Sequence, residues 1–497
     1  MHFSDVLTHF SPQDYLSSSV RPYFNHSVQF KRHSTSRERV AILENAGLNV
    51  FQFPSEFVSG CDLLSDSGTT TMTNEQWAAL SLGDEAYGSN KGYFMLRDRV
   101  YKTFGESFDC IYLFHQGRAA EHALFSQLAR IGKHLIIPSN GHFDTTLANI
   151  EMNGMKAVTL FSKKLHVQKS SDRFKGNIDI DRLEALLKKH HQSIPLMFLT
   201  ITNNTGGGQP VSMENIRLTA ERAKSYAIPL FFDACRFAEN AWFIKQYEPE
   251  FRNMKISAIV KEMFSYVDGF TISFKKDGLV NMGGGLIIKS SGQFIKKFPD
   301  LVDDLTNYQI MTEGHPTYGG MSGRDIMTLV YGLKTVLREQ YLSYRVGQIE
   351  SFGQKMLAHG LPVLTPFGGH AIYLDMNRFF EDTSLQPNDF GGISFTALLL
   401  ALFGHRACEL GNFAFGVYDL KTKKESFPEV NFVRFAVPRL RYEKEDLEHV
   451  AESVKHLYEL RDKIPGVEVV YGKELPLRHF KARFKFKSRS SSQSAFM

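Results

Sequence analysis

The sequence predicts an α/β fold, with a mainly parallel sheet covered by helices on both faces and a smaller α+β domain after it. Two observations predict this fold. Short apolar runs alternate with amphipathic helical stretches through the middle of the chain, a pattern typical of a parallel sheet buried on both faces. From about Ile326 the pattern changes to long helices with a few strands among them. At 497 residues the chain also exceeds the size at which one core stops growing, so two or more domains are expected.

The elements of the first domain follow from the order of these runs. We expect strands at 134–139 ("HLIIPS"), 195–202 ("PLMFLTIT"), 228–234 ("IPLFFDA"), 269–274 ("GFTISF") and 283–289 ("GGGLIIK"). Each is largely apolar along its length, as burial on both faces requires. Helical stretches are expected within 115–129, where a loop leads into a helix, and at 212–227 and 237–246.

The second domain is expected to be built from longer helices. Residues 326–360 predict long helices, "HAIYLDM" and "NFVRFAV" predict strands, and 444–463 predicts a further helix. The predicted organisation is an N-terminal arm with part of the small domain (1–64), a large domain (65–328), the small domain (329–484) and a disordered, basic, serine-rich tail (485–497).

Composition excludes several function classes. The 58 basic and 53 acidic residues give a net charge of +5, which is too mild for this length to indicate nucleic-acid binding. The longest apolar run, "FTALLLALFG", is about half of what a membrane span needs. The four cysteines show neither a CxxC pair nor zinc-ligand spacing, and the first 30 residues lack the apolar core of a signal peptide. We therefore expect a cytoplasmic protein that binds neither nucleic acid nor membrane.

One short motif, "SFKKDG", places two lysines between two buried-strand runs. Lysine side chains usually stay in water, so a pair in this position indicates chemistry. Three other features lie near the ends of predicted strands, where open α/β sheets bind ligands. Gly117 and Arg118 begin a helix, Asn204 begins a glycine-rich loop, and Asp233 ends a strand 43 residues before Lys276.

These features supply the parts of a pyridoxal-phosphate site. The cofactor needs a lysine for a Schiff base, an anion that keeps its pyridine nitrogen protonated, and a helix N-terminus with a cation for its phosphate. Burial lowers the pKa of a lysine, which makes its amine available as a nucleophile and a base. The residues alone also fit a parallel-sheet enzyme of another kind with a solvated lysine pair.

Longer motifs carry a resemblance to a known family. In chain order they are "LLSDSGT", "GDEAY", "HQGRAAE", "NNTGGGQPVSMEN", "FFDACRFAENAWFIKQ", "SFKKDGLVNMGGG", "EGHPTYGG", "GGHAIYLD" and "VRFAVPR". They closely resemble those of the β-eliminating lyases, which include tryptophanase (tryptophan indole-lyase) and tyrosine phenol-lyase, and the match runs from about residue 38 to residue 486. The resemblance implies fold type I of the pyridoxal-phosphate-dependent transferases, with a seven-stranded sheet in the large domain. It also implies a potassium-activated homotetramer that cleaves an aromatic amino acid to an arene, pyruvate and ammonia.

The resemblance assigns roles to residues by motif. It implies the Schiff-base lysine at Lys276, the partner of the pyridine nitrogen at Asp233 and a residue near the ring oxygen at Arg236. The other implied cofactor contacts are Gln116, Gly117, Arg118, Phe143, Asn204 and Ser273, with Phe143 stacked on the ring. Ser65, Asn204 and Arg434 are implied to bind the substrate carboxylate, for which a bidentate arginine is well suited.

Two further sets of residues are implied by the same motifs. Tyr87 resembles the general acid that the family brings in from a neighbouring subunit. Glu85, Asn281 and the Gly68 carbonyl resemble the potassium ligands, all of them hard oxygens. Lys275 is expected to be a supporting cation near the cofactor.

Three positions favour tryptophan over tyrosine as the substrate. Leu410 stands where tyrosine phenol-lyase has an arginine that can bind the phenol oxygen. Asp144 and His479 match tryptophanase, where the phenol enzyme has threonine and phenylalanine, and they are candidates for holding the indole N–H or placing a proton. Without the family resemblance, a turn cap is an equally good interpretation of Asp144, and a packed surface histidine is an equally good interpretation of His479.

Departures from the family keep other functions open. Phe274 stands where the family has glycine or alanine, and Ser65 replaces a threonine but keeps its hydroxyl. These changes leave room for a tyrosine phenol-lyase, a broader aromatic or cysteine-type β-lyase, or a family member that binds the cofactor without catalysis. An aminotransferase on the same fold is disfavoured by the family motifs.

Overall fold

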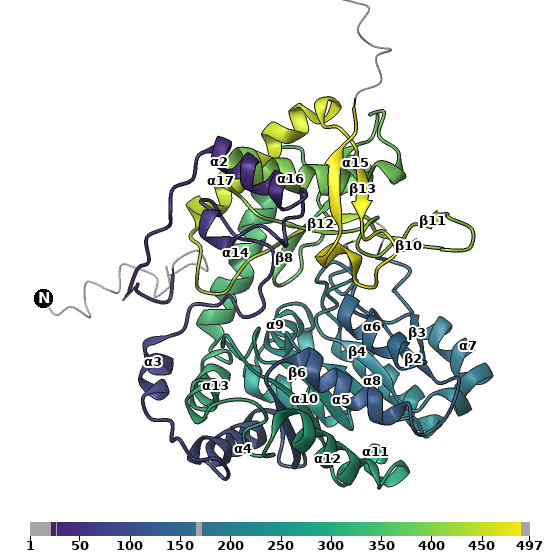
Figure 1. Ribbon diagram of the computed structural model, residues 1–497. Helices are drawn as coiled ribbons and strands as arrows, with labels where there is room; N and C mark the ends of the chain where they lie inside the picture. Colours follow the sequence, from purple (N-terminus) through teal and green to yellow (C-terminus); the bar gives the residue numbers. More distant parts are fainter. Residues whose placement is uncertain (1–20, 26, 166–170, 489–497) are drawn as a thin grey trace, which may run out of the picture.

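A seven-stranded sheet lies at the centre of the lower half of the computed structural model in Figure 1, which describes residues 21–25, 27–165 and 171–488. Its strands are β1 (Cys110–Phe114), β2 (Ile136–Ser139), β3 (Lys156–Thr159), β4 (Met197–Thr200), β5 (Leu230–Asp233), β6 (Gly269–Ser273) and β7 (Gly284–Ile288). The order across the sheet is β1-β7-β6-β5-β4-β2-β3. Only β7 runs antiparallel to its neighbours, β1 and β6. The prediction of a mainly parallel seven-stranded sheet is therefore confirmed.

Helices cover both faces of this sheet because successive strand side chains point to opposite sides. Phe231 belongs to the core beneath one face and its neighbour Phe232 to the core beneath the other. The covering helices are α4 (Lys91–Phe104), α5 (Gly117–Leu128), α6 (Asp144–Met152), α7 (Ile180–His190), α8 (Met213–Ser225), α9 (Phe237–Tyr247), α10 (Ile256–Ser265), α11 (Gln293–Lys297), α12 (Leu301–Glu313) and α13 (Gly323–Thr335). The short helix α3 (Asn74–Leu80) packs on α13.

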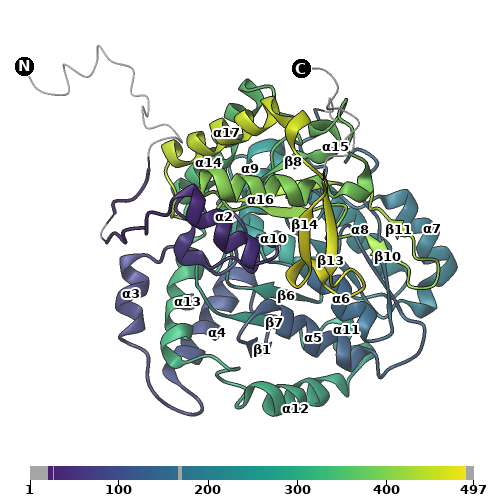
Figure 2. The same ribbon diagram turned by 45° about the horizontal axis from the view of Figure 1, so that its top comes forward.

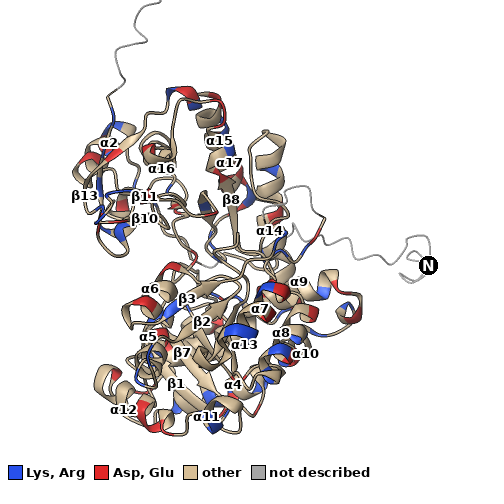
Figure 3. Cartoon of the chain, turned by 90° about the vertical axis from the view of Figure 1, so that its right-hand side faces the viewer, with Lys and Arg blue, Asp and Glu red and all other residues tan. Residues whose placement is uncertain are grey.

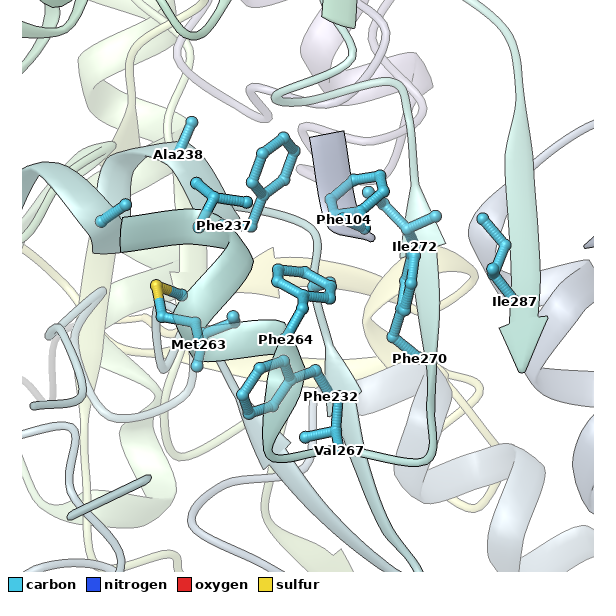
Figure 4. Packing of buried hydrophobic residues seen from close by; sticks show 14 of the residues in the cluster. Phe104, Phe232, Phe237, Ala238, Met263, Phe264, Val267, Phe270, Ile272 and Ile287 are labelled. Atoms are coloured by element: carbon cyan, nitrogen blue, oxygen red, sulfur yellow. The ribbon is translucent and has the colours of Figure 1, made fainter. Parts of the chain in front are cut away.

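Phenylalanine side chains cluster within the larger of these cores, among aliphatic residues (Figure 4). The ring of Phe264 on α10 lies 4.6 Å from that of Phe104 on α4 and 4.9 Å from that of Phe270 on β6. Tilted and edge-to-face contacts of this kind add stability beyond the apolar area they bury. The core fixes the strand ends that carry the candidate site.

The upper half contains a three-stranded antiparallel sheet in the order β8-β12-β9. Its strands and helices are β8 (Ala371–Asp375), β9 (Cys408–Leu410), β12 (Phe432–Ala436), α14 (Glu339–Ala358), α15 (Met376–Phe379), α16 (Gly391–Phe403) and α17 (Lys444–Glu459). Two hairpins, β10 (Val417–Tyr418) with β11 (Glu425–Ser426) and β13 (Val467–Tyr471) with β14 (Arg483–Phe486), complete it. The early helix α2 (Ser36–Asn45) lies beside α16 (Figure 2).

The change from one core to the other occurs inside α14. Residues up to Leu342 pack with the seven-stranded sheet, whereas Ile349 and the residues after it pack with the three-stranded sheet. The predicted boundary between residues 328 and 329 instead falls within α13, whose apolar face belongs to the first core. At the C-terminus, β14 extends two residues into the predicted tail, and residues 489–497 of that tail lie outside the described residues.

Basic and acidic residues are interspersed along the outer helices, whereas the strands of the large sheet carry few charges (Figure 3). Within 21–25, 27–165 and 171–488, no helix combines the length and the apolar character that a bilayer crossing requires.

Candidate active site

A cavity of about 270 Å³ opens where the carboxyl ends of β1, β5 and β6 face the upper half of the molecule. The large-sheet half contributes Gln116, Gly117, Arg118, Glu121, Phe143, Asp144, Asn204, Asp233, Arg236, Ser273, Lys275 and Lys276 to its walls. Residues packed in or against the upper half contribute Phe51, Ser65, Leu410, Arg434 and His479. Most of the residues predicted from the sequence therefore meet in one cavity at the edge of the sheet where such folds bind ligands.

Both lysines of the motif line the cavity, and both are half-buried. Burial, together with the nearby cations Lys276 and Arg118, lowers the pKa of Lys275. The Lys275 carbonyl accepts a hydrogen bond from the Gly68 N–H at 2.7 Å, which ties the lysine turn to the loop around Gly68. Lys276 lines the same cavity as Asp233, as contact of both with one cofactor requires.

Asp233 ends β5 with its side chain buried at the cavity wall. Its Oδ1 accepts a hydrogen bond from the Cys235 N–H at 3.3 Å. Close by, Glu121 on α5 is buried and its Oε1 accepts a hydrogen bond from the Thr146 hydroxyl at 2.7 Å. Burial, followed by the charge of Asp233, raises the pKa of Glu121 to about 8. Glu121 is thus a neutral acid beside an aspartate at neutral pH.

This raised pKa predicts a pH-dependent stability difference between the wild type and Glu121→Gln. Between the ordinary glutamate pKa of 4.5 and about 8, the folded protein keeps a proton that the unfolded chain releases. The contribution of Glu121 to the free energy of unfolding is therefore fully present below pH 4.5 and is lost as pH rises towards 8. In thermal melts of the cofactor-free proteins, the Tm of Glu121→Gln should rise relative to that of the wild type as pH increases. Glu106→Gln, which removes an exposed carboxylate, is the control, and an equally flat difference for both variants would contradict a protonated Glu121.

The N-terminus of α5 forms one end of the cavity. The helix begins at Gly117, and the preceding Gln116 makes no side-chain cap, so the first-turn N–H groups face the cavity without a capping oxygen from that residue. A Cβ at Gly117 would lie 2.7 Å from the Cβ of Ser273, so only glycine allows this approach. With Arg118 and Ser273 at the same end, the arrangement suits an anion.

A buried hydrogen-bonded pair also lines the cavity. The Nε2 atom of His479 is 3.0 Å from the Oδ2 atom of Asp144, and both side chains are buried. Asp144 is the first residue of α6, directly after Phe143, and its Oδ1 also accepts a hydrogen bond from the Thr145 N–H at 2.6 Å. Asp144 thus contacts the first turn of α6 as well as His479, and His479 is buried rather than on the surface. Leu410 lines the cavity with these residues.

Arg434 and Asn204 meet across the two halves. The Arg434 Nη1 donates to Asn204 Oδ1 at 3.2 Å and its Nη2 to the Leu64 carbonyl at 3.1 Å. The Tyr373 hydroxyl donates to the same Asn204 oxygen at 2.8 Å. The guanidinium of Arg434 lies 6.0 Å from the centre of the Phe143 ring. Ser65 lines the cavity beside Leu64, so the residues predicted to bind the substrate carboxylate lie together.

Arg236 lines the cavity, but its guanidinium is engaged elsewhere. It forms a buried bidentate ion pair with Asp66, at 2.7 and 3.0 Å. Two of the Arg236 donors, Nε and Nη2, are bonded to Asp66, a carboxylate that the sequence interpretation did not use.

Phe274 does not line the cavity. Its side chain is fully buried in the core of the large sheet. A Cβ at Gly278 would lie 2.7 Å from the Phe274 Cβ, and one at Gly285 would lie 3.2 Å from its ring. The neighbouring glycines therefore make room for this large residue on the side away from the cavity.

Tyr87 and Glu85 do not join the cavity within a single chain. Tyr87 is 74% exposed and packs edge-on against His315 and Tyr318, while Glu85 lies 3.5 Å from Arg324. Of the residues implied as potassium ligands, Gly68 and Asn281 do meet, because the Asn281 amide donates to the Gly68 carbonyl at 3.0 Å. A single chain thus brings together two members of the predicted potassium set, with Glu85 paired elsewhere.

Several residues of the site were missed by the sequence interpretation. Glu121, Asp66 and Tyr373 stand inside the motifs "HQGRAAE", "LLSDSGT" and "GGHAIYLD". Their polar groups, placed within the motifs of the predicted site, were an available signal, since a buried polar group needs a partner. Phe51, whose ring meets His479 edge-on at 5.6 Å, carries no such signal.

The residues present fit pyridoxal phosphate. The cavity offers an amine at Lys276, a carboxylate at Asp233 and a helix N-terminus narrowed by Gly117, which match the aldehyde, the ring nitrogen and the phosphate of that group. The fold defines the class: fold type I of the pyridoxal-phosphate-dependent transferases. The crystal structure of an aspartate aminotransferase from Thermotoga maritima matches with a TM-score of 0.54, covering 85% of this chain and 95% of that chain at 12% identity.

Within that class, the chain belongs to the β-eliminating lyase family. The model of this family, described as beta-eliminating lyase, matches residues 62–453. A tryptophanase of Hyphomonas neptunium is 39% identical over 471 residues, which cover 95% of this chain and 100% of that protein. A tyrosine phenol-lyase of Lacrimispora saccharolytica is 37% identical over 482 residues, covering 96% and 97%. A probable beta-eliminating lyase of Trichomonas vaginalis is 39% identical over 448 residues, covering 90% and 94%. The family supports pyridoxal-phosphate-dependent β-elimination, and the choice of substrate depends on the cavity.

Proposed function

We propose that the protein catalyses the pyridoxal-phosphate-dependent β-elimination of L-tryptophan to indole, pyruvate and ammonia. The observation that carries this proposal is the buried hydrogen-bonded pair of Asp144 and His479 beside Leu410 in the cavity. The pair offers acceptor and donor atoms to an indole ring, whereas Leu410 offers no cation to a phenol oxygen.

Binding uses residues of both halves. Arg434, Asn204 and Ser65 bind the substrate carboxylate, and the apolar wall around Leu410 holds the aromatic side chain away from water. Contacts with both the carboxylate and the aromatic side chain orient the α-carbon of the substrate towards the Lys276 amine for proton removal. Arg118 with the first turn of α5 anchors the phosphate end of the cofactor.

Different residues remove, hold and deliver the protons of the reaction. Pyridoxal phosphate, when bound, supplies an aldehyde that condenses with an amine and a ring that accepts the electron pair of the α-carbon. Lys276 holds the cofactor and, once its amine is released, removes the α-proton of the substrate. Asp233 keeps a proton on the ring nitrogen by its negative charge. Tyr87, with Asp144 and His479, delivers a proton to the indole carbon that bears the side chain, which makes indole a leaving group.

The position of Tyr87 supports a proposed assembly. In its own chain this side chain is exposed and does not line the cavity, as expected for a residue donated to another subunit. We infer a homotetramer in which a neighbouring copy supplies Tyr87, and Glu85 completes a potassium site with Gly68 and Asn281. Hard oxygen atoms from a carboxylate and carbonyls suit such a cation.

A single comparison tests substrate, activity and potassium together. The purified holoenzyme should release indole from L-tryptophan faster than phenol from L-tyrosine, and more rapidly in potassium than in sodium buffer. Phenol release faster than indole release would overturn the choice of tryptophan. Bound cofactor with no turnover of either amino acid, or of S-alkylcysteine, would instead support the non-catalytic alternative.

A further inference from the structure

A buried cluster of charged side chains adjoins the cavity. Each member is at most 3% exposed, and three arginines balance three carboxylates: Asp66, Arg236, Glu239, Asp277, Arg345 and Arg439. Removing ions from water is costly, and buried ion pairs are often no more stabilising than well-packed apolar residues. A cluster of this size beside a catalytic lysine therefore calls for a role other than stability.

Arg439 is the centre of the cluster. Its Nη1 lies 3.0 Å from Asp66 Oδ2, and its Nη2 lies 2.8 Å from Glu239 Oε1 and 2.9 Å from Asp277 Oδ1. These carboxylates belong to three separate segments: the loop after Ser65, the first turn of α9 and the turn that carries the lysine pair. A planar guanidinium can hold three such acceptors in fixed directions, which a lysine ammonium does less well.

Asp277, the residue directly after Lys276, is held through both of its carboxylate oxygens. While its Oδ1 accepts from Arg439, its Oδ2 accepts from the N–H groups of Ala238 at 2.8 Å and Glu239 at 3.2 Å. Asp277 therefore caps α9 from outside, a helix whose preceding residue makes no side-chain cap. The lysine turn is held by charge-assisted hydrogen bonds on both oxygens of one carboxylate.

The opposite side of the cluster reaches the residues proposed to bind the substrate carboxylate. Arg439 follows Arg434 by five residues, just past the end of β12. Asp66 follows Ser65, and both line the cavity. One guanidinium thus joins the segments of Arg434 and Ser65 to the segment of Lys276.

We propose that Arg439 is a positioning residue that, through Asp66 and Asp277, holds the Lys276 amine in register with the site for the substrate carboxylate. This inference rests on the proposed pyridoxal-phosphate chemistry but does not depend on which amino acid is eliminated. It assigns Arg439 and Asp277 a role in activity that a purely structural ion pair would lack.

The test measures the visible absorbance of the cofactor-bound protein against pH, without an amino-acid substrate. Asp277→Asn removes a negative charge near the protonated Schiff base and should lower the midpoint of this titration. Arg439→Met removes a positive charge and should raise it, each by about half a unit or more. Lys275, Arg118, Asp233 and Glu121 face the same cavity and stay unchanged in both variants. Opposite shifts are a signature that loss of stability alone does not produce.

Arg406→Met is the matched control, since the buried Arg406 forms an ion pair with the partly buried Asp62 away from the cavity walls. Its midpoint should equal that of the wild type. If Arg439→Met does not fold, Arg439→Lys keeps the charge and carries the test with Asp277→Asn. The kcat of Arg439→Lys should fall about tenfold or more, while the midpoint of its absorbance titration should equal that of the wild type. Midpoints and kcat of all Arg439 and Asp277 variants equal to those of Arg406→Met would overturn the proposal, whereas failure to release indole would overturn only the choice of substrate.

Discussion

Lys276→Ala is expected to lower the rate of β-elimination by about 10²–10⁴-fold or more, because the α-proton loses its general base and the cofactor its covalent anchor. The visible absorbance of the bound cofactor should disappear with the side chain. Borohydride treatment of the wild-type protein should label position 276, and the variant should take up no label there.

Lys275→Ala is the matched control for this experiment. Both lysines line the cavity, and they differ only in the role assigned to them. The Lys275 variant should keep the borohydride label on Lys276 and lose less activity. A label on Lys275 in the wild type, or undiminished elimination by Lys276→Ala, would show that the catalytic lysine has been assigned wrongly.

Asp233→Asn is expected to lower kcat by about 10²–10³-fold while the cofactor remains bound, since one charge aimed at the ring nitrogen is lost. The buried position of Asp233 at the end of β5 leaves little water to replace that charge. Single-turnover measurements should locate the defect in α-proton removal rather than in substrate binding. Asp233→Glu, which keeps the charge, should recover part of the rate. Equal rates for the asparagine variant and the wild type would remove Asp233 from the mechanism.

The strands of the large sheet were predictable because burial on both faces makes them continuously apolar. The expected strand at 228–234 corresponds to β5 (Leu230–Asp233), and that at 269–274 to β6 (Gly269–Ser273). Strands β1 (Cys110–Phe114) and β3 (Lys156–Thr159), the second of them partly exposed, were missed, and the antiparallel direction of β7 has no local signal. Direction depends on the pairing of Cys110 with Ile288, which are far apart in sequence.

The candidate site was predictable where a motif carried a chemical demand, as at Lys276 and Asp233. Contacts between distant segments were not, since no periodicity reports which buried charge meets which. Arg236 is the clearest case: its position beside the cavity followed from its motif, whereas its ion pair with Asp66 depends on how the loop after Ser65 folds back.

The helix α14 has a mechanical consequence. Because its start packs with one core and its end with the other, one connection between the two halves is a continuous helix rather than a loop. A movement that brings Arg434 closer to the lysines therefore has to bend this helix or shift its packing against one of the two cores.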